Sequence, residues 1–317
     1  MAAGSMSAAT PNGRALDCMI VGGHKCGTTS LKEYLAEHPG VVTHPQLEFT
    51  GFSEEGYSQS REAEELARLL GTAEGRLTLA KHAGLYADAF GLDRLAEASP
   101  RCKVLFILRD PIARTRSAFR MEAVMGTESE EAFEDVIARA VELDRTGEGG
   151  ADWRVRVYLH WSRYGRWLGE IRRRFPSDNV KVMFQEELTA DPRGTYRGLC
   201  LWLGLDPEFV PDLNVRHNVG SKPRSAALGR ALRLMRSERN PVKRAARGLL
   251  PETAYLKLGE AARNANRADR SETRVGNSAV DELLGQYFAE DGEQLRRLLG
   301  RELPWDVRDA QPLPHPG

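Results

Sequence analysis

Five short apolar runs divide the chain, and longer segments with helical spacing separate them. A short continuous apolar run between turn signals is typical of a strand that is buried on both faces of a sheet. Strands that alternate with helices favour a parallel sheet joined by right-handed crossovers. We therefore expect an α/β fold around a central parallel sheet. The expected strands are residues 17–22, 41–43, 77–80, 103–108 and 179–184.

The longest helical pattern covers residues 153–175. Its apolar residues recur at spacings of three and four, which is the period of one face of an α-helix. We expect a single amphipathic helix whose aromatic residues pack in the core rather than stack on a ligand. The apolar positions are Val157, Trp161, Tyr164, Leu168, Ile171 and Phe175.

The composition is that of a globular chain, since 41% of its 317 residues are hydrophobic and 45 basic residues balance 45 acidic ones. Without net charge, the whole chain is not drawn to nucleic acid or to an acidic membrane, so any anion must be bound by local charge. The four cysteines show neither metal-ligand spacing nor a secreted disulfide framework. Only eight of the basic residues are lysine, an arginine bias that suggests a bacterial genome rich in GC.

No linker interrupts the chain, so we expect one domain over residues 17–306. Residues 1–16 are small, polar and aperiodic, and we expect them to be disordered. They lack the apolar centre of a signal peptide, and no apolar run is long enough to span a membrane, which favours a cytoplasmic location. Residues 307–317 are expected to form a C-terminal tail.

A glycine-rich turn follows the first expected strand, over residues 22–30. Glycines let the backbone approach an anion, and the N–H groups at the start of the next helix point at it. Lys25 adds a positive charge, and three successive hydroxyl residues add donors. Gly22 and Gly27 have the separation of a nucleotide triphosphate loop, but Thr28 occupies the lysine position of that motif. The alternative is a simple turn with an incidental lysine.

A second anion site is indicated where the strand 103–108 ends in Arg109. Ligands bind at the carboxyl ends of strands in open α/β sheets. Ser117 falls two turns along the next helix, and an arginine with a serine hydroxyl suits a phosphate. Asp110 can be read as a helix cap, and Arg114 and Arg116 as solvated.

Together the two segments resemble those of the sulfotransferases that use 3′-phosphoadenosine 5′-phosphosulfate (PAPS). The loop reads GxxKxGTTxL and the second segment RDPxxRxxSxF, in the family's order. The resemblance extends over roughly residues 17–306 and implies a P-loop-like three-layer α/β/α fold. It also implies that Arg109 and Ser117 hold the 3′-phosphate. The loop residues implied to hold the 5′-phosphosulfate are Gly23, His24, Lys25, Cys26, Gly27, Thr28, Thr29 and Ser30.

Residues 44–58 look like the P-x-K-E-x-x-F-F segment of the carbohydrate and heparan-sulfate-type members, which places Glu48 at the general base. The family's preceding lysine is Leu47 here. The alternative is that Glu48 is an exposed loop carboxylate. Glu54 and Glu55 resemble an acidic pair of the family, and can equally be surface charges.

Residues 79–86 align more loosely with the family segment E-K-[ST]-P-x-Y-F, because Ala80 and Ala83 replace its glutamate and proline. The resemblance implies that Lys81 helps to neutralise the transferring group. His82 is a competing candidate for the base, or a structural histidine.

A basic segment covers residues 221–250. The family carries a basic, glycine-containing loop in this region, which implies cofactor contacts for Ser221, Lys222 and Arg224. Residues 230–247 are expected to form a solvated helix face, although they could receive an anionic acceptor.

The predicted reaction is transfer of a sulfuryl group from PAPS to a hydroxyl of a sugar or natural product, by in-line displacement and without a metal. Lys25 is expected to stabilise the charge that develops on the bridging oxygen, with Lys81 assisting. The product of the donor is adenosine 3′,5′-bisphosphate (PAP). One alternative is a nucleotide-dependent kinase with Asp110 at a metal. The other is a nucleotide-binding protein without catalytic activity.

Overall fold

The structure is a computed structural model, and its described residues fall into five stretches of the chain. These are residues 15–54, 57–71, 73–128, 131–213 and 279–305. The predictions for residues 1–14, Glu55, Ser221, Lys222, Arg224, residues 230–247 and residues 307–317 lie outside them. Leu16, at the end of the segment expected to be disordered, is instead 1% exposed, and its N–H donates to the Ser99 hydroxyl at 2.9 Å.

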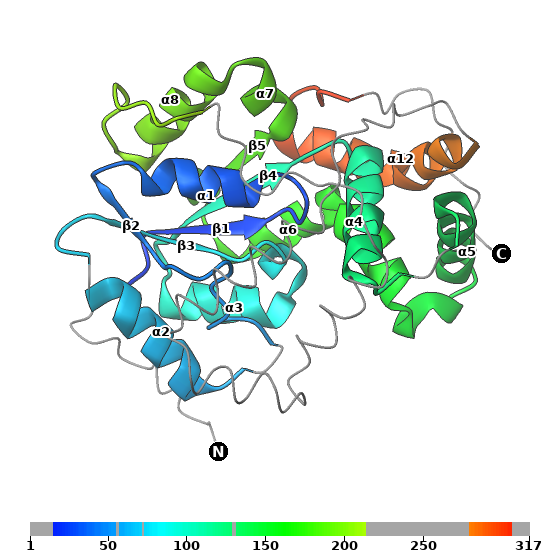
Figure 1. Ribbon diagram of the computed structural model, residues 1–317, viewed down its shortest axis with the longest axis horizontal. Helices are drawn as coiled ribbons and strands as arrows, with labels where there is room; N and C mark the ends of the chain where they lie inside the picture. Colours follow the sequence, from blue (N-terminus) through cyan, green and yellow to red (C-terminus); the bar gives the residue numbers. More distant parts are fainter. Residues whose placement is uncertain (1–14, 55–56, 72, 129–130, 214–278, 306–317) are drawn as a thin grey trace. The chain divides into compact units, whose positions relative to one another are not determined.

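Five parallel strands form one sheet in the order β2-β3-β1-β4-β5 (Figure 1). Each strand agrees within one residue at either end with an expected one, so the predicted α/β fold with a central parallel sheet is confirmed. The strands are β1 (Cys18–Gly22), β2 (Val41–Thr43), β3 (Leu77–Lys81), β4 (Lys103–Leu108) and β5 (Val180–Phe184).

Helices cover both faces of this sheet (Figure 1). On one face α8 packs beside α1, where the Tyr196 hydroxyl donates to the Tyr34 carbonyl at 3.3 Å. On the other face α3 contacts α6. The helices packed with the sheet are α1 (Thr28–Ala36), α2 (Gln59–Gly71), α3 (Ala89–Ala98), α6 (Tyr164–Arg174), α7 (Gln185–Ala190) and α8 (Pro192–Leu203).

The two central strands explain why the pattern of apolar runs was informative. The β1 residues Cys18–Val21 and the β4 residues Val104–Leu108 have no solvent exposure. Helices on both faces remove any need for polar residues at alternate positions, so the strands read as continuous apolar runs.

The described chain forms two compact units. The first contains the sheet and comprises the described residues up to Arg114, those from Trp161 to 213 and those from 288 to 305. The second comprises Thr115–His160 and residues 279–287, with helix α5 (Phe133–Arg145). The helices α4 (Pro111–Met125) and α12 (Ala279–Leu299) have residues in both. The single-domain organisation stays a prediction.

Glu128 binds two side chains within the second unit. Arg154 lies 2.9 Å from the Glu128 carboxylate, and the Tyr158 hydroxyl donates to the same carboxylate at 2.8 Å. Burial and the Glu128 charge raise the pKa of Tyr158 above its ordinary value.

The expected single helix over residues 153–175 is wrong. A π-helix, Val155–Leu159, is followed by a short 3₁₀ turn, His160–Ser162, and only then by α6. Two backbone carbonyls of this segment accept hydrogen bonds from side chains outside it. The Thr115 hydroxyl donates to the Tyr158 carbonyl at 2.9 Å, and the Tyr86 hydroxyl donates to the Trp161 carbonyl at 2.6 Å. These tertiary bonds compete with regular helical pairing. The apolar stripe is buried as expected except at Trp161, which is partly buried against the core.

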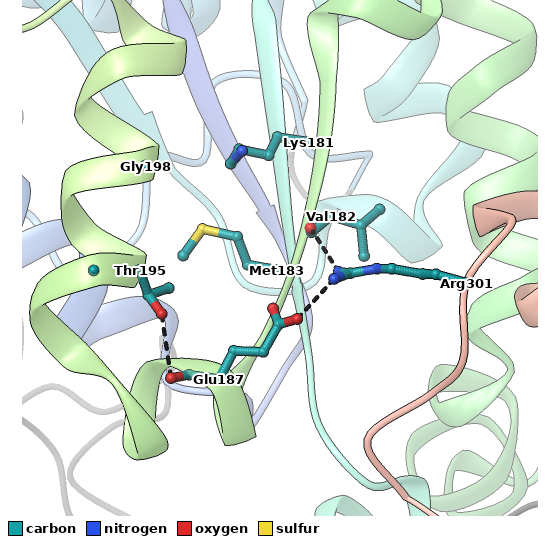
Figure 2. A pocket seen from close by; sticks show the side chains of 8 residues that line it. Lys181, Val182, Met183, Glu187, Thr195, Gly198 and Arg301 are labelled. Carbon is teal, nitrogen blue, oxygen red and sulfur yellow. Dashed lines mark hydrogen bonds and ion pairs between the residues drawn. The ribbon is translucent and has the colours of Figure 1, made fainter.

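A hollow lies along β5, the strand at the edge of the sheet (Figure 2). Arg301 reaches into it, 2.7 Å from the Glu187 carboxylate and 3.5 Å from the Val182 carbonyl. None of the described residues that line this hollow is a predicted site residue.

The order of the strands in the sheet indicates a ligand position away from the hollow along β5. From β1 the chain crosses to β2 and β3 on one side, and then to β4 on the other side of β1. A crevice opens where the strand order reverses in this way, at the carboxyl ends of the two strands. In this sheet those ends belong to β1 and β4, which are followed by the glycine loop and by Arg109.

Candidate active site

Two glycines shape the loop between β1 and α1. Gly22 has φ 154°, and a β-carbon at this position would collide with the Tyr86 ring. Gly27, the N-cap of α1, has φ 92°, a left-handed conformation that glycine adopts without strain. The Gly23 N–H donates to the Ile107 carbonyl at 2.6 Å, which ties the loop to β4.

The loop leads into α1 with neither a side-chain cap nor an acidic residue in the first turn. The first N–H groups of a helix have no partner within it, and the helix dipole adds partial positive charge there. This end of α1 is therefore suited to bind an anion. The loop residues predicted to bind the donor lie in this turn and in the first turn of α1: Gly23, His24, Lys25, Cys26, Gly27, Thr28, Thr29 and Ser30.

Positive charge gathers at this loop although the whole chain is neutral. Burial lowers the pKa of His24 well below its ordinary value, and the charges of Arg114, Lys25 and Lys81 lower it further. These groups are therefore close enough to His24 to act on it. An anion bound at the loop would meet this concentration of cations.

Arg109 lies at the same edge of the sheet. It directly follows β4, which pairs with β1. Its charge acts on Cys26 in the loop and on Glu186, which follows β5. The two predicted anion sites, around Lys25 and Arg109, therefore lie at the carboxyl ends of two paired strands.

Ser117 is buried on α4 and belongs to the second unit, whereas Arg109 belongs to the first. A 3′-phosphate site shared by the two residues stays a prediction. Between them, Asp110 acts as the expected helix cap, because its side chain accepts the Ile112 N–H at 3.0 Å.

Cys26 does not fit the role of a nucleophile. Burial raises the pKa of its thiol to about 11, and its sulfur lies 3.6 Å from the Tyr164 hydroxyl. A thiol that stays protonated and buried contributes packing rather than nucleophilic attack.

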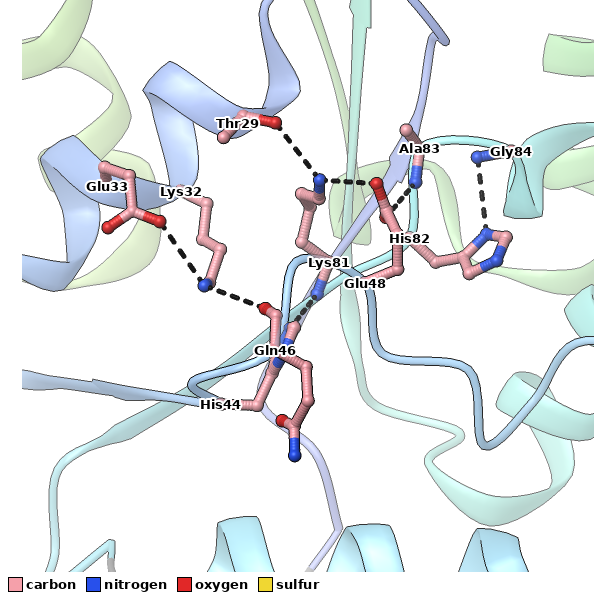
Figure 3. Close-up of polar contacts among 10 residues, drawn as sticks. All are labelled: Thr29, Lys32, Glu33, His44, Gln46, Glu48, Lys81, His82, Ala83 and Gly84. Atoms are coloured by element: carbon pink, nitrogen blue, oxygen red, sulfur yellow. Dashed lines mark hydrogen bonds and ion pairs between the residues drawn. The ribbon is translucent and has the colours of Figure 1, made fainter. Parts of the chain in front are cut away.

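Glu48 and Lys81 form an ion pair at the end of β3 (Figure 3). The Lys81 ammonium lies 2.7 Å from one Glu48 oxygen, and the Ala83 N–H donates to the other at 2.8 Å. The lysine side chain is 0% exposed and the glutamate side chain is 30% exposed. The Lys81 ammonium also donates to the Thr29 hydroxyl at 3.3 Å, so one cation joins the carboxylate to the first turn of α1, which together with the preceding turn, residues 22–27, is called the anion loop below.

The segment before Glu48 is fixed from two sides (Figure 3). Lys32 of α1 donates to the Gln46 carbonyl at 3.2 Å. His44 accepts the Lys81 N–H on its Nε2 at 3.1 Å. Burial lowers the pKa of His44 to about 3, helped by the charges of Lys32 and Lys81, so the ring stays neutral and can accept this hydrogen bond.

His82 is placed less favourably for a base. Its Nδ1 accepts the Gly84 N–H at 3.3 Å, so the proton of the neutral ring is on Nε2. Burial lowers its pKa below the ordinary value. With one nitrogen accepting and the other carrying a proton, the ring has no acceptor left for a hydroxyl proton.

The sequence did not predict the structural roles of two residues in this region. Arg114, which the sequence suggested to be solvated, is 0% exposed and hydrogen-bonds to His24. His44 supports Lys81 through the adjacent strands β2 and β3. A signal for His44 exists, because it directly follows a strand that pairs with β3.

Within the described residues, no group of three or more His, Cys, Asp and Glu side chains could hold a metal ion. Across the same residues, no helix is long and apolar enough to cross a membrane.

Comparison with known proteins gives relatives in one family. The chain is 26% identical over 213 residues to the bifunctional heparan sulfate N-deacetylase/N-sulfotransferase 1 of Caenorhabditis briggsae, over 63% of this chain and 24% of that protein. It is 28% identical over 193 residues to human heparan sulfate glucosamine 3-O-sulfotransferase 6, over 59% of this chain and 52% of that protein. The matches thus span about a quarter and about half of the lengths of these relatives.

The fold also agrees with a solved structure. A sulfotransferase from Alicyclobacillus acidocaldarius superposes with a TM-score of 0.61 at 22% identity, over 92% of this chain and 98% of that chain. Residues 16–240, most of the chain, match the family model described as the sulfotransferase domain. The chain therefore belongs to the sulfotransferase domain family, whose members use PAPS as the sulfuryl donor and release PAP.

Proposed function

We propose that this chain transfers a sulfuryl group from PAPS to an acceptor hydroxyl, with Glu48 as the general base. The observation that carries the proposal is the Lys81 ammonium, which contacts both the Glu48 carboxylate and the Thr29 hydroxyl at the start of α1. The buried Lys81 ammonium therefore contacts both the proposed base, Glu48, and the proposed donor site at the start of α1.

The residues present fit the donor. The uncapped N-terminus of α1 and the cations around His24 suit a phosphosulfate, and Arg109 with Ser117 would hold the 3′-phosphate. When bound, PAPS supplies an activated sulfuryl group, whose sulfur is open to attack opposite the bond to the departing phosphate. Lys25 and the loop N–H groups would balance the charge that develops on the phosphate side.

Glu48 would take the proton from the acceptor hydroxyl as the new bond to sulfur forms. Its carboxylate is partly exposed, so a hydroxyl can approach it from solvent. Lys81 and the Ala83 N–H fix the carboxylate in one orientation. Fixed position and general base assistance are the two contributions that this arrangement can make to the rate.

For the acceptor, we propose a hydroxyl of a small natural product or a glycan. Leu47, beside Glu48, is 50% exposed. The resemblance to glycan sulfotransferases would place a lysine at this position. An apolar side chain offers no charge to a sulfated or uronic glycan, so this position favours an acceptor with an apolar portion. We further propose that the chain is bacterial and acts in the cytoplasm.

The test uses PAP first and a radiolabelled donor second. Calorimetry should show binding of PAP to the full chain, and label should pass from sulfate-labelled PAPS to members of a panel of hydroxylated acceptors. Transfer from labelled ATP with Mg²⁺ in place of PAPS would favour the kinase alternative. Binding of PAP without transfer to any member of a broad panel would favour a binding protein.

A further inference from the structure

Arg114 is a buried arginine whose guanidinium contacts His24 of the anion loop. Its side chain is 0% exposed. The Nε donates to the His24 carbonyl at 3.2 Å, one terminal nitrogen lies 3.2 Å from Nδ1 of the His24 ring, and the other donates to Ser162 at 3.3 Å. The guanidinium is also 5.9 Å from the centre of the Trp161 ring. One side chain thus grips both the backbone and the ring of a single loop residue.

The contact with the ring fixes the tautomer of His24. A guanidinium can only donate hydrogen bonds, so Nδ1 of His24 must be the acceptor and the proton of the neutral ring must be on Nε2. The low pKa of His24 agrees with a neutral ring. His24 is therefore held as a neutral donor, with its Nε2–H on the side of the ring away from Nδ1.

The contact with the backbone orients the next peptide group. The bond between His24 and Lys25 is trans, so the Lys25 N–H points opposite to the His24 carbonyl. Because that carbonyl faces Arg114, the Lys25 N–H faces away from Arg114. Lys25 adopts the left-handed conformation, with φ 69°, which is costly for a residue with a side chain and needs support from its surroundings.

We propose that Arg114 is a positioning residue for the donor site, which sets the orientation of the His24–Lys25 peptide and the tautomer of His24. The inference rests on the proposed function in so far as the anion is PAPS or PAP. It links the two motifs physically, since the arginine of the second motif shapes the loop of the first. A single point charge cannot replace it, because the fork of the guanidinium reaches three acceptors at once.

The experiment measures the ring and the ligand separately. Nitrogen-detected NMR of the full chain should show His24 as the Nε2–H tautomer, with its signal assigned by its loss in His24→Gln. In Arg114→Met the Nδ1 acceptor loses its donor, and we expect the Nδ1–H tautomer to become populated. Calorimetry should show PAP affinity reduced about tenfold to a hundredfold, as expected when a buried hydrogen-bond network loses one partner.

Arg94→Met is the matched control. Arg94 on α3 is partly buried, with its side chain 22% exposed, and lies 3.0 Å from the Glu62 carboxylate, but it has no contact with the loop among the described residues. This variant should lower stability while the His24 tautomer and the PAP dissociation constant stay within twofold of the wild type. Loss of stability alone is thereby separated from loss of position.

Arg114→Lys keeps the experiment decisive if Arg114→Met does not fold. Its ammonium keeps the charge but lacks the fork, so PAP affinity should still fall and the tautomer should still mix. An unchanged tautomer and an affinity within twofold of the wild type, in either variant, would overturn the proposal. If the wild type does not bind PAP but its tautomer depends on Arg114, the proposed function fails and the positioning of the loop stands.

Discussion

The Lys81 ammonium is completely buried, whereas its partner Glu48, 2.7 Å away, is partly open to solvent. The two halves of this ion pair therefore depend on each other unequally. Without Lys81, the Glu48 carboxylate keeps the Ala83 N–H and can be hydrated. Without Glu48, the ammonium is left in the interior with the Thr29 hydroxyl as its remaining acceptor among the described residues.

Glu48→Gln should lower kcat by about 10²–10⁴-fold, because an amide cannot take the acceptor proton. The PAP dissociation constant should change little, since Glu48 does not contact the loop directly. Steady-state kinetics and calorimetry on the same preparation measure both. Retention of more than a tenth of the wild-type kcat would show that Glu48 is not the base, and His82→Gln would then be the next variant to assay.

The same pair predicts an order of stabilities. Glu48→Gln should lower the free energy of unfolding by more than Lys81→Met, because only the former leaves a buried charge without its counter-ion. Urea unfolding of both variants at neutral pH tests the order. Equal losses would mean that water reaches Lys81 once Glu48 is removed.

The pH dependence of the Glu48→Gln variant follows from Lys81. Burial lowers the pKa of Lys81 below its ordinary value, and Glu48 opposes this shift. A lowered lysine pKa in the folded state means that the unfolded chain binds the proton more tightly, so stability rises with pH up to the ordinary lysine pKa. In Glu48→Gln this rise should be larger and begin at lower pH than in the wild type. Parallel unfolding curves for the two proteins between neutral and alkaline pH would contradict the prediction.

The sheet was predictable because burial on both faces leaves a simple mark in the sequence. Helices cover β1 and β4 on each side, and each of these strands is a continuous run of apolar residues with turn signals at its ends. The segment at residues 153–175 carried an equally regular pattern, but hydrogen bonds from Thr115 and Tyr86 decided its backbone. Partners so far away in the chain leave no mark in a local period.

The candidate site was predictable only in part, for a similar reason. The resemblance named Glu48 and Lys81 separately, and the sheet order then explains why the end of β3 meets the start of α1. The sequence does not predict the burial of Arg114, because a charged residue on a helix is usually solvated. Its burial depends on acceptors in the His24 backbone and at Ser162, and backbone acceptors cannot be read from residue types.

Asp291 of α12 predicts a second dependence on pH. Its two oxygens accept the Gly165 and Arg166 N–H groups at 2.8 and 2.9 Å, at the N-terminus of α6. Burial nevertheless raises its pKa from 3.8 to about 6. The folded state then binds the proton more tightly than the unfolded chain, so stability should fall as pH rises between about 4 and 6, by at most about 3 kcal/mol.

Asp291→Ala is the reference for that measurement. The variant loses a helix cap, which costs about 1 kcal/mol, but it also loses the titration. The difference in free energy of unfolding between wild type and variant should therefore shrink as pH rises from 4 to 6. A difference that grows over this interval would show that the two N–H donors outweigh burial and lower the pKa of Asp291 instead.

Gly22 and Gly27 should tolerate alanine very differently, although both have positive φ. A β-carbon at Gly22 meets the Tyr86 ring and, at 3.0 Å, the Ala83 carbonyl, and the nearest of these atoms cannot move without disturbing the core. At Gly27 the nearest described atom is Nε2 of Gln185 at 3.9 Å, so only the left-handed backbone opposes alanine, at about 1–2 kcal/mol. Gly22→Ala should therefore fail to fold or lose several times more stability than Gly27→Ala, as measured by urea unfolding.

Gly27→Ala should stay folded but bind PAP more weakly, because alanine strains the start of α1 away from the geometry that binds the anion. Gly27→Ala with wild-type affinity for PAP would show that the turn before α1 is needed for the packing of the loop and not for its ligand.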